Sequence, residues 1–187
     1  MTTSGSDWQT CDRFLELRSH WFTLIGEHLI DDRQQPLDYW RVERADSVIV
    51  LPIQLERLIL PPPAYRPGIS QCSLDFPGGR LPEDKSPEDA ARLILQRELG
   101  VPPTAIVDLT PLNPDGWAVN SSFSNQRLYG FMAQIQPEFE LTSDRVGMNV
   151  AITPEAIRQL LQTLTCLQCR ALVLQWWLDR SSIAGIR

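Results

Sequence analysis

The sequence contains no long apolar segment and no excess of positive charge. No apolar run approaches the roughly 18 residues that a membrane-spanning helix requires. The 17 Lys and Arg residues are outnumbered by 23 Asp and Glu residues, which gives a net charge of −6. Because a general electrostatic grip on nucleic acid or on an anionic membrane requires a positive surface, we expect neither partner. The N-terminus has neither a basic start nor an apolar core, so we expect no signal peptide and a cytoplasmic protein.

Cysteine is also scarce, with four residues in a chain of 187. This number is too small for a disulfide framework in a protein of this length. Cys166 and Cys169 form a Cys-x-x-Cys pair, but the sequence has no second pair to complete a four-ligand zinc site. We therefore interpret the pair as small, half-buried residues at the start of a helix, and a redox or metal role is the less favoured alternative.

The composition is that of an ordinary soluble globular protein, with 43% hydrophobic and 21% charged residues. A chain of this length forms one domain, or one domain with an appendage. We expect residues 37–187 to form that domain. Residues 1–36 are expected to be an N-terminal extension that belongs either to the domain or to a dimer interface, and their apolar pattern fits both helix and strand. The sequence contains no internal repeat or low-complexity segment.

Alternating and β-branched apolar residues predict a series of strands. The triple proline Pro61-Pro62-Pro63 donates no backbone hydrogen bond, so the chain must leave the sheet there. The predicted strands cover residues 37–44, 47–51, 57–60, 71–76, 105–109 and 127–135.

The clearest helix follows a glycine turn. Ser86 is a good N-cap, Pro87 suits the first helical position, and Gly100 provides the stop. The turn before it contains Gly78 and Gly79, which permit backbone angles or close approaches that are denied to other residues. This order of strand, turn and helix indicates where function should be sought.

The C-terminal part repeats the helix signals. Thr153 is a second N-cap, with Pro154 at the first helical position. A further helix is predicted over residues 167–179, and we assign its Trp176 and Trp177 to the core or to a subunit interface.

The segment from Leu74 to Val101 resembles the Nudix box. In that pattern a glycine is followed by five residues, Glu, seven residues, Arg-Glu, an apolar residue, one residue, Glu-Glu, one residue, Gly and an apolar residue. Gly79 and Gly100 match the first and last glycines, 21 positions apart, and Leu95 and Val101 match the apolar places. The resemblance implies an α/β Nudix fold, an α/β/α sandwich with a mixed β-sheet.

The reactive positions of the box differ from the pattern. Lys85, Ile94 and Arg97 stand at three of its four acidic positions, Leu93 replaces its Arg, and only Glu98 remains acidic. These four positions carry a net charge of +1 where the family pattern carries −4. Because Mg²⁺ requires oxygen ligands and Arg97 opposes a cation beside Glu98, we expect no cofactor. Mg²⁺ is expected only if the protein is an active hydrolase, with Glu98 as its catalytic and metal-binding residue.

The order of elements over residues 37–178 resembles the ADP-ribose pyrophosphatase branch of this family. Ala64-Tyr65-Arg66 is similar to its Gln-Tyr-Arg motif, and Asp75 stands for the acidic residue of its Glu-Leu-Pro-Ala-Gly motif. Gln126 takes the place of the usual catalytic base and cannot accept a proton usefully, although it can hydrogen-bond a ligand. The resemblance also implies a homodimer. Its implied substrate-binding residues are Arg66, Asp75, Gly78, Gly79, Lys85, Arg97, Asn125 and Gln126.

Three functional hypotheses follow. In the first, the protein binds an ADP-ribose-like or other nucleoside diphosphate compound with little or no metal-dependent hydrolysis, and Lys85 and Arg97 replace part of the cation's charge. In the second, it is an active hydrolase that combines Glu98 with substitute carboxylates such as Asp75, Glu83, Glu88 or Asp89. In the third, the fold is a scaffold for protein interactions and catalyses nothing.

Overall fold

The computed structural model describes residues 8–183, and their side chains up to residue 180. The chain divides into two compact units. The N-terminal unit comprises the chain up to residue 45 together with residues 118–127, and the main unit comprises residues 46–117 and the chain from residue 128 onward. Within the described residues, no helix combines the length and the apolar character needed to cross a membrane.

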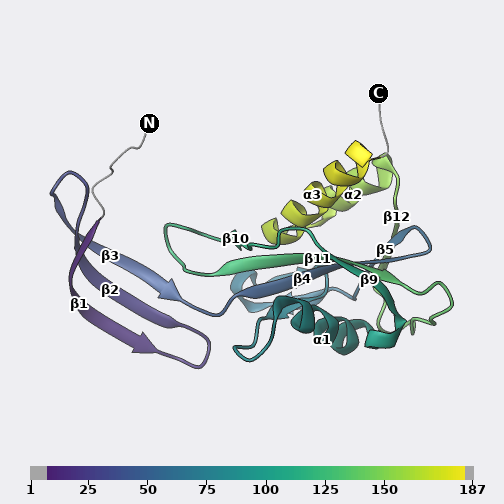
Figure 1. Ribbon diagram of the computed structural model, residues 1–187, viewed down its shortest axis with the longest axis horizontal. Helices are drawn as coiled ribbons and strands as arrows, with labels where there is room; N and C mark the ends of the chain where they lie inside the picture. The colour runs from purple at the N-terminus through teal and green to yellow at the C-terminus, as the bar shows by residue number, and fades with distance from the viewer. Residues whose placement is uncertain (1–7, 184–187) are drawn as a thin grey trace. The chain divides into compact units, whose positions relative to one another are not determined.

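The N-terminal unit is a three-stranded antiparallel sheet in the order β1-β2-β3 (Figure 1). Its strands are β1 (Gln9–Arg18), β2 (Thr23–Ile30) and β3 (Pro36–Glu43). The region that fitted both helix and strand is therefore strand. The hairpin between β2 and β3 turns on Asp31, whose Oδ1 accepts hydrogen bonds from the backbone N–H groups of Arg33 and Gln35, each at 2.8 Å.

The main unit contains a mixed sheet in the order β10-β11-β4-β5-β12, with β8 paired to β4 and β9 paired to β11. β4 and β11 are parallel, whereas β5 and β8 pair antiparallel with β4, β9 pairs antiparallel with β11, and β12 pairs antiparallel with β5. After the triple proline the chain leaves this sheet and forms a separate ribbon of β6 (Ala64–Arg66) and β7 (Gln71–Ser73). The sheet strands are β4 (Ser47–Gln54), β5 (Arg57–Leu60), β8 (Gly78–Arg80), β9 (Ile106–Pro111), β10 (Trp117–Ala118), β11 (Arg127–Ile135) and β12 (Met148–Ala151).

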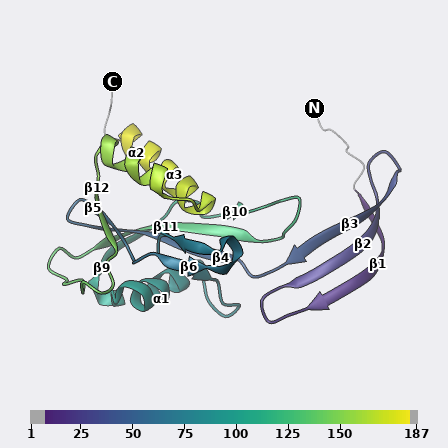
Figure 2. The same ribbon diagram turned by 180° about the vertical axis from the view of Figure 1, so that it is seen from behind.

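The sheet of the main unit lies between helices. α1 (Pro87–Leu99) lies on one side, and α2 (Pro154–Thr163) and α3 (Leu167–Ile183) lie on the other, as Figures 1 and 2 show from opposite directions. This is the α/β/α arrangement with a mixed sheet that the Nudix-box resemblance implied.

Both predicted N-caps are present. Ser86 Oγ accepts a hydrogen bond from the Asp89 N–H at 3.1 Å, and Thr153 Oγ1 accepts one from the Ala156 N–H at 3.3 Å. Gly100 ends α1 in the left-handed region, with φ of 71°. The helix therefore begins and ends where the sequence predicted.

The core of the main unit fills the space between the sheet and its helices. On the α1 side, Ile94 and Leu95 pack with residues of β4 and β11 in one buried cluster. On the other side, a Cβ at Gly130 in β11 would lie 2.0 Å from Leu172 Cδ2, so glycine allows α3 to approach the sheet closely. Trp176 is buried in this core, as one of our two alternatives for it predicted.

Candidate functional site

Gly78 and Gly79, which the sequence predicted to form a turn, are instead the first residues of β8, and this strand leads into the loop before α1. We keep the name glycine turn for these two residues. Gly78 pairs with Ile49 and Gly79 pairs with Val48 in the antiparallel ladder with β4. A Cβ at Gly78 would lie 3.0 Å from Ile49 Cγ1 and 3.1 Å from the Val48 carbonyl oxygen, and a Cβ at Gly79 would lie 3.0 Å from Arg97 Nη2. Neither glycine has a positive φ. Close approach of neighbouring atoms, rather than an unusual backbone angle, is what requires glycine here.

The end of α1 holds this turn through what we call the Arg97 clamp, formed by Gly78, Arg97 and Glu98. Arg97 Nη2 donates to the Gly78 carbonyl at 3.0 Å and to Glu98 Oε1 at 2.5 Å. The Gly78 N–H donates to Glu98 Oε2 at 3.3 Å. Both carboxylate oxygens of Glu98 therefore accept hydrogen bonds from the protein, and Arg97 compensates the negative charge of Glu98.

The side chains at the acidic positions of the Nudix pattern do not suit a magnesium cluster. Ile94 is only 2% exposed and belongs to the core. Lys85 lies on the loop before α1 and pairs with Asp84, with 3.3 Å between Nζ and Oδ2. Glu98 is the single carboxylate among these positions, and Arg97 already neutralises it. Because Mg²⁺ requires several oxygen ligands, this donor set does not fit the ion.

Leu93, which stands in the place of the pattern's Arg, is the neighbour of Ile94 in α1 but is not buried with it. Its side chain is 48% exposed in the single chain, because it lies on the face of α1 that points away from the sheet. Successive helical residues differ in direction by about 100°, so only one of the pair reaches the core.

Arg145 is a residue of this region that the sequence did not indicate. Its Nη1 donates to the Arg97 carbonyl at 3.0 Å, and its Cδ would lie 3.3 Å from a Cβ at Gly100. A cation at the C-terminal end of a helix satisfies carbonyls that have no partner within the helix. Arg145 thus supports the backbone from which Arg97 extends. It lies in a loop without a recognisable motif, so the sequence did not indicate it.

Arg66 and Asp75, both predicted to contact substrate, contact each other. Arg66 Nε and Nη2 lie 2.8 and 2.7 Å from Asp75 Oδ2, and Ser73 Oγ donates to the same oxygen at 2.9 Å. The Asp75 side chain is only 14% exposed, and its other oxygen, Oδ1, is buried without a hydrogen-bond partner among the described residues. The carboxylate is therefore fixed through one oxygen only.

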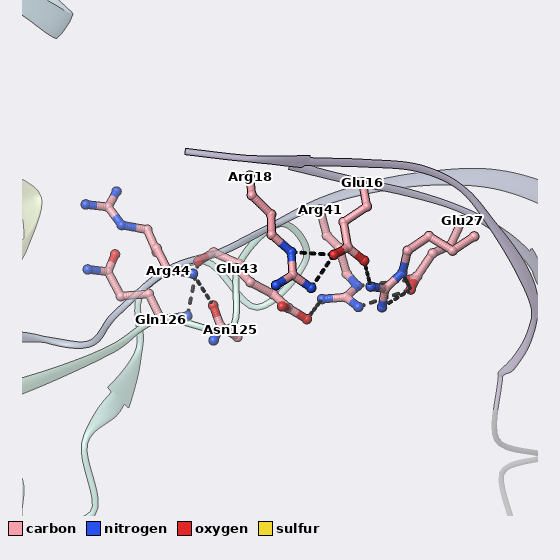
Figure 3. A network of polar contacts seen from close by, with 10 residues as sticks. Glu16, Arg18, Glu27, Arg41, Glu43, Arg44, Asn125 and Gln126 are labelled. Atoms are coloured by element: carbon pink, nitrogen blue, oxygen red, sulfur yellow. Dashed lines mark hydrogen bonds and ion pairs between the residues drawn. The ribbon is translucent and has the colours of Figure 1, made fainter. Parts of the chain in front are cut away.

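Asn125 and Gln126 belong to the N-terminal unit, where they fasten the loop of residues 118–127 to the end of β3 (Figure 3). Asn125 Oδ1 accepts a hydrogen bond from the Arg44 N–H at 2.9 Å, and Gln126 Nε2 donates to the Ala45 carbonyl at 3.2 Å. Gln126 is 6% exposed. Both amides thus have structural partners within their own unit.

The N-terminal unit also contains a charged network along its sheet (Figure 3). Glu27 is buried at its centre, where Arg41 Nε and Nη2 lie 2.9 and 3.1 Å from its carboxylate oxygens and Arg13 Nη2 lies 3.2 Å away. Hydrogen bonds from Arg41 are the main reason that the pKa of Glu27 lies below its ordinary value, and burial opposes them.

Comparisons with known proteins support the same fold. No family model matches the chain, and no curated protein matches it. Among solved structures, 218 chains match. One of these, described as a crystal structure of ADP compounds hydrolase, is 19% identical and has a TM-score of 0.74, with 98% of each chain covered. At this identity the likeness shows the fold, and the chain therefore has a Nudix-like α/β/α fold with a mixed sheet.

Proposed function

We propose that this protein binds a nucleoside diphosphate compound at the glycine turn, with little or no metal-dependent hydrolysis. The observation that carries the proposal is the Arg97 clamp, in which a guanidinium group lies against Gly79 and neutralises Glu98. The similar structure that is described as an ADP compounds hydrolase supports the ligand class.

The exposed N–H donors of the clamp suit a phosphate more than a cation. Proteins that keep all four acidic residues of the Nudix box are expected to neutralise a diphosphate with metal ions held by those carboxylates. In this chain Arg97 keeps 61% of its side-chain surface exposed, so its guanidinium can offer N–H donors to a phosphate from beside the turn. Lys85 lies on the loop that joins the turn to α1 and adds a second positive charge.

The other residues that the resemblance implied are also proposed to contact a ligand. Arg66 is half exposed and is the candidate for a second phosphate or ribose contact. Asp75 is proposed to bind ligand through hydrogen bonds, in addition to the protein partners that it already has. Within the N-terminal unit, Asn125 and Gln126 are separate candidates for hydrogen bonds to a ligand.

The test is calorimetric titration with ADP-ribose, in Mg²⁺ and in chelator, together with an assay for AMP release. We expect equal binding in both buffers and no product. A charge-assisted hydrogen bond contributes about 1.5–3 kcal/mol, so Arg97→Gln should weaken binding by roughly 10- to 150-fold. Arg92→Gln is the matched control, because Arg92 lies on the same helix and pairs with Glu88 instead.

Two other outcomes would replace the proposal. AMP release that requires Mg²⁺ or Mn²⁺ and disappears in Glu98→Gln would make the protein an active hydrolase. Its substitute carboxylates would then have to give up present partners, since Glu88 pairs with Arg92, Asp89 accepts from Ser86 Oγ, and Asp75 is bound as described. Absence of binding at millimolar ligand would instead favour a protein-interaction module.

A homodimer is also part of the proposal. It is supported by large apolar side chains that are exposed on the N-terminal unit, an arrangement that commonly marks an interface. Light scattering over a range of concentrations tests it, and a mass of one chain throughout would reject it. The exposed residues are Trp8, Phe14, Leu17, Trp21, Phe22 and Trp40.

A further inference from the structure

The Cys-x-x-Cys pair has a third partner in space. Cys166 directly precedes α3, and Cys169 lies in the first turn of that helix. Asp75 comes from the segment that follows β7, about ninety positions earlier in the chain. One ligand atom from each of the three side chains lies within 4.8 Å of the other two. Among the described residues, this is where such side chains converge.

We propose that Asp75, Cys166 and Cys169 bind a single divalent metal ion of the zinc class. Zinc binds thiolate sulfur at about 2.3 Å and carboxylate oxygen at about 2.0–2.2 Å, so the ligand atoms of a tetrahedral ion lie about 3.5–3.8 Å apart. The three ligand atoms lie within 4.8 Å of one another, so each pair has to approach by at most about 1 Å to bind the ion. Three protein ligands leave a fourth position, which water completes.

The surroundings of Asp75 match those of a metal ligand. Arg66 and Ser73 bind Oδ2 and fix the plane of the carboxylate, as outer-shell partners do in metal sites. Oδ1 is left buried and without a partner among the described residues. An orphaned buried oxygen is costly, and a metal ion bound by the two sulfurs beside it would satisfy it.

Charge balance favours a bound divalent ion. Two thiolates and a carboxylate carry three negative charges. A divalent ion and the guanidinium of Arg66 together neutralise all three, so the complete site is neutral in its partly buried position.

An ion can reach the three ligands from solvent, and the N-terminal end of α3 favours their negative charge. Cys169 is 1% exposed, whereas Cys166 is half-buried at the helix N-terminus and is open to solvent on one side. The aligned peptide dipoles of α3 favour negative charge at this end. The ion would therefore enter past Cys166 and bind Cys169 and Asp75 beneath it.

The experiment uses the reduced, metal-depleted full-length protein and measures binding of Zn²⁺ and of Co²⁺. We expect one ion per chain, thiolate-to-cobalt charge-transfer absorption, and a higher melting temperature with Zn²⁺. Cys166→Ser, Cys169→Ser and Asp75→Asn should each weaken Zn²⁺ binding by more than the roughly 10- to 100-fold cost of losing an outer-shell partner. Cys72→Ser is the matched control, since Cys72 is exposed and lies outside the cluster.

Arg66→Gln keeps all three ligands and guards against variants that fail to fold. It should weaken Zn²⁺ binding by roughly 10- to 100-fold while the cobalt spectrum keeps its thiolate bands. The proposal is overturned if the reduced protein binds neither ion, if Cys72→Ser weakens binding as much as Cys166→Ser, or if Zn²⁺ fails to protect Cys166 and Cys169 from forming a disulfide in air. Arg66 and Asp75 occur in both proposals, but Cys166→Ser and Cys169→Ser alter the metal site alone and Arg97→Gln alters the clamp alone, so the two proposals fail separately.

Discussion

An acidic residue at position 94 should strongly destabilise the protein and should not create a metal site. The Nudix pattern places Glu there, but this chain has Ile94, which is 2% exposed. Ile94 packs in the buried cluster with Val48 and Leu95, between α1 and the sheet. Ile94→Glu therefore places a carboxyl group in a space that is lined by apolar side chains.

The expected cost has two parts. Truncation of a buried Ile costs about 2–5 kcal/mol, and a buried polar group without a partner adds about 1–3 kcal/mol. The total of roughly 3–8 kcal/mol compares with about 5–15 kcal/mol for the whole stability of a domain. Burial also raises the pKa of the introduced carboxyl, so the folded state holds the proton more tightly than the unfolded state does. The loss of stability should consequently grow as the pH rises from the ordinary Glu value through the raised one.

Urea denaturation followed by circular dichroism measures the effect at neutral and mildly acidic pH. Leu93→Glu is the matched control, because Leu93 is the neighbouring residue and is 48% exposed. It should change the free energy of unfolding by no more than about 0.5 kcal/mol. The reasoning fails if Ile94→Glu is as stable as Leu93→Glu at neutral pH, or if its stability does not depend on pH.

Two further substitutions test buried polar groups. Glu27→Gln should lower the free energy of unfolding by about 1–3 kcal/mol near neutral pH, because it removes charge-assisted hydrogen bonds from Arg41 and Arg13. Since the pKa of Glu27 is lowered on folding, this difference should disappear in denaturation curves as the pH falls through that lowered value, and a constant difference would contradict the network. Asn113→Ala should lower the free energy of unfolding by about 2–3 kcal/mol, because it leaves the Leu128 carbonyl and the Gly130 N–H without a partner. These groups bond the buried Asn113 amide at 2.7 and 2.6 Å. An effect below about 0.5 kcal/mol would refute this reasoning.

The parts of the fold that the sequence predicted are those with local signals. Ser86, Pro87 and Gly100 delimit α1 through cap chemistry that acts within one helical turn. The β-branched run at residues 47–51 predicted β4, whose side chains are buried on both faces. In each case the residue type and its neighbours in sequence are sufficient to determine the element.

The elements without such signals were missed or left open. β12 spans only Met148–Ala151 and is held by pairing with β5, which lies about ninety positions earlier in the chain. Residues 9–30 form two strands, of which β1 is exposed along almost its whole length and β2 is buried at several successive positions, so neither shows a regular alternation of buried and exposed residues. Pairing with a neighbouring strand decides both cases, and periodicity within a short window does not report it.

The candidate site likewise contains some features that have a local sequence signal and others that do not. The resemblance identified the glycine turn and the positions on α1, because these depend on spacing along the chain. The meeting of Asp75 with Cys166 and Cys169 depends on how α3 packs beside the segment after β7, so the missing ligand of the Cys-x-x-Cys pair was not visible from cysteine spacing. Arg145 reaches the end of α1 for the same reason.

The differences from the Nudix pattern on α1 are not equally reversible. Arg97 is 61% exposed, so an acidic residue at its position would cost little stability and would release Glu98 from its present partner. Ile94 is part of the core, and an acidic residue there requires the sheet face to be repacked around it. Exchange of surface charges alone therefore cannot rebuild a cluster of carboxylates on this helix. Because the clamp ties Gly78 to the end of α1 through Arg97, the turn keeps its shape without a cation, and the positive group that holds it is also the one that a phosphate would meet.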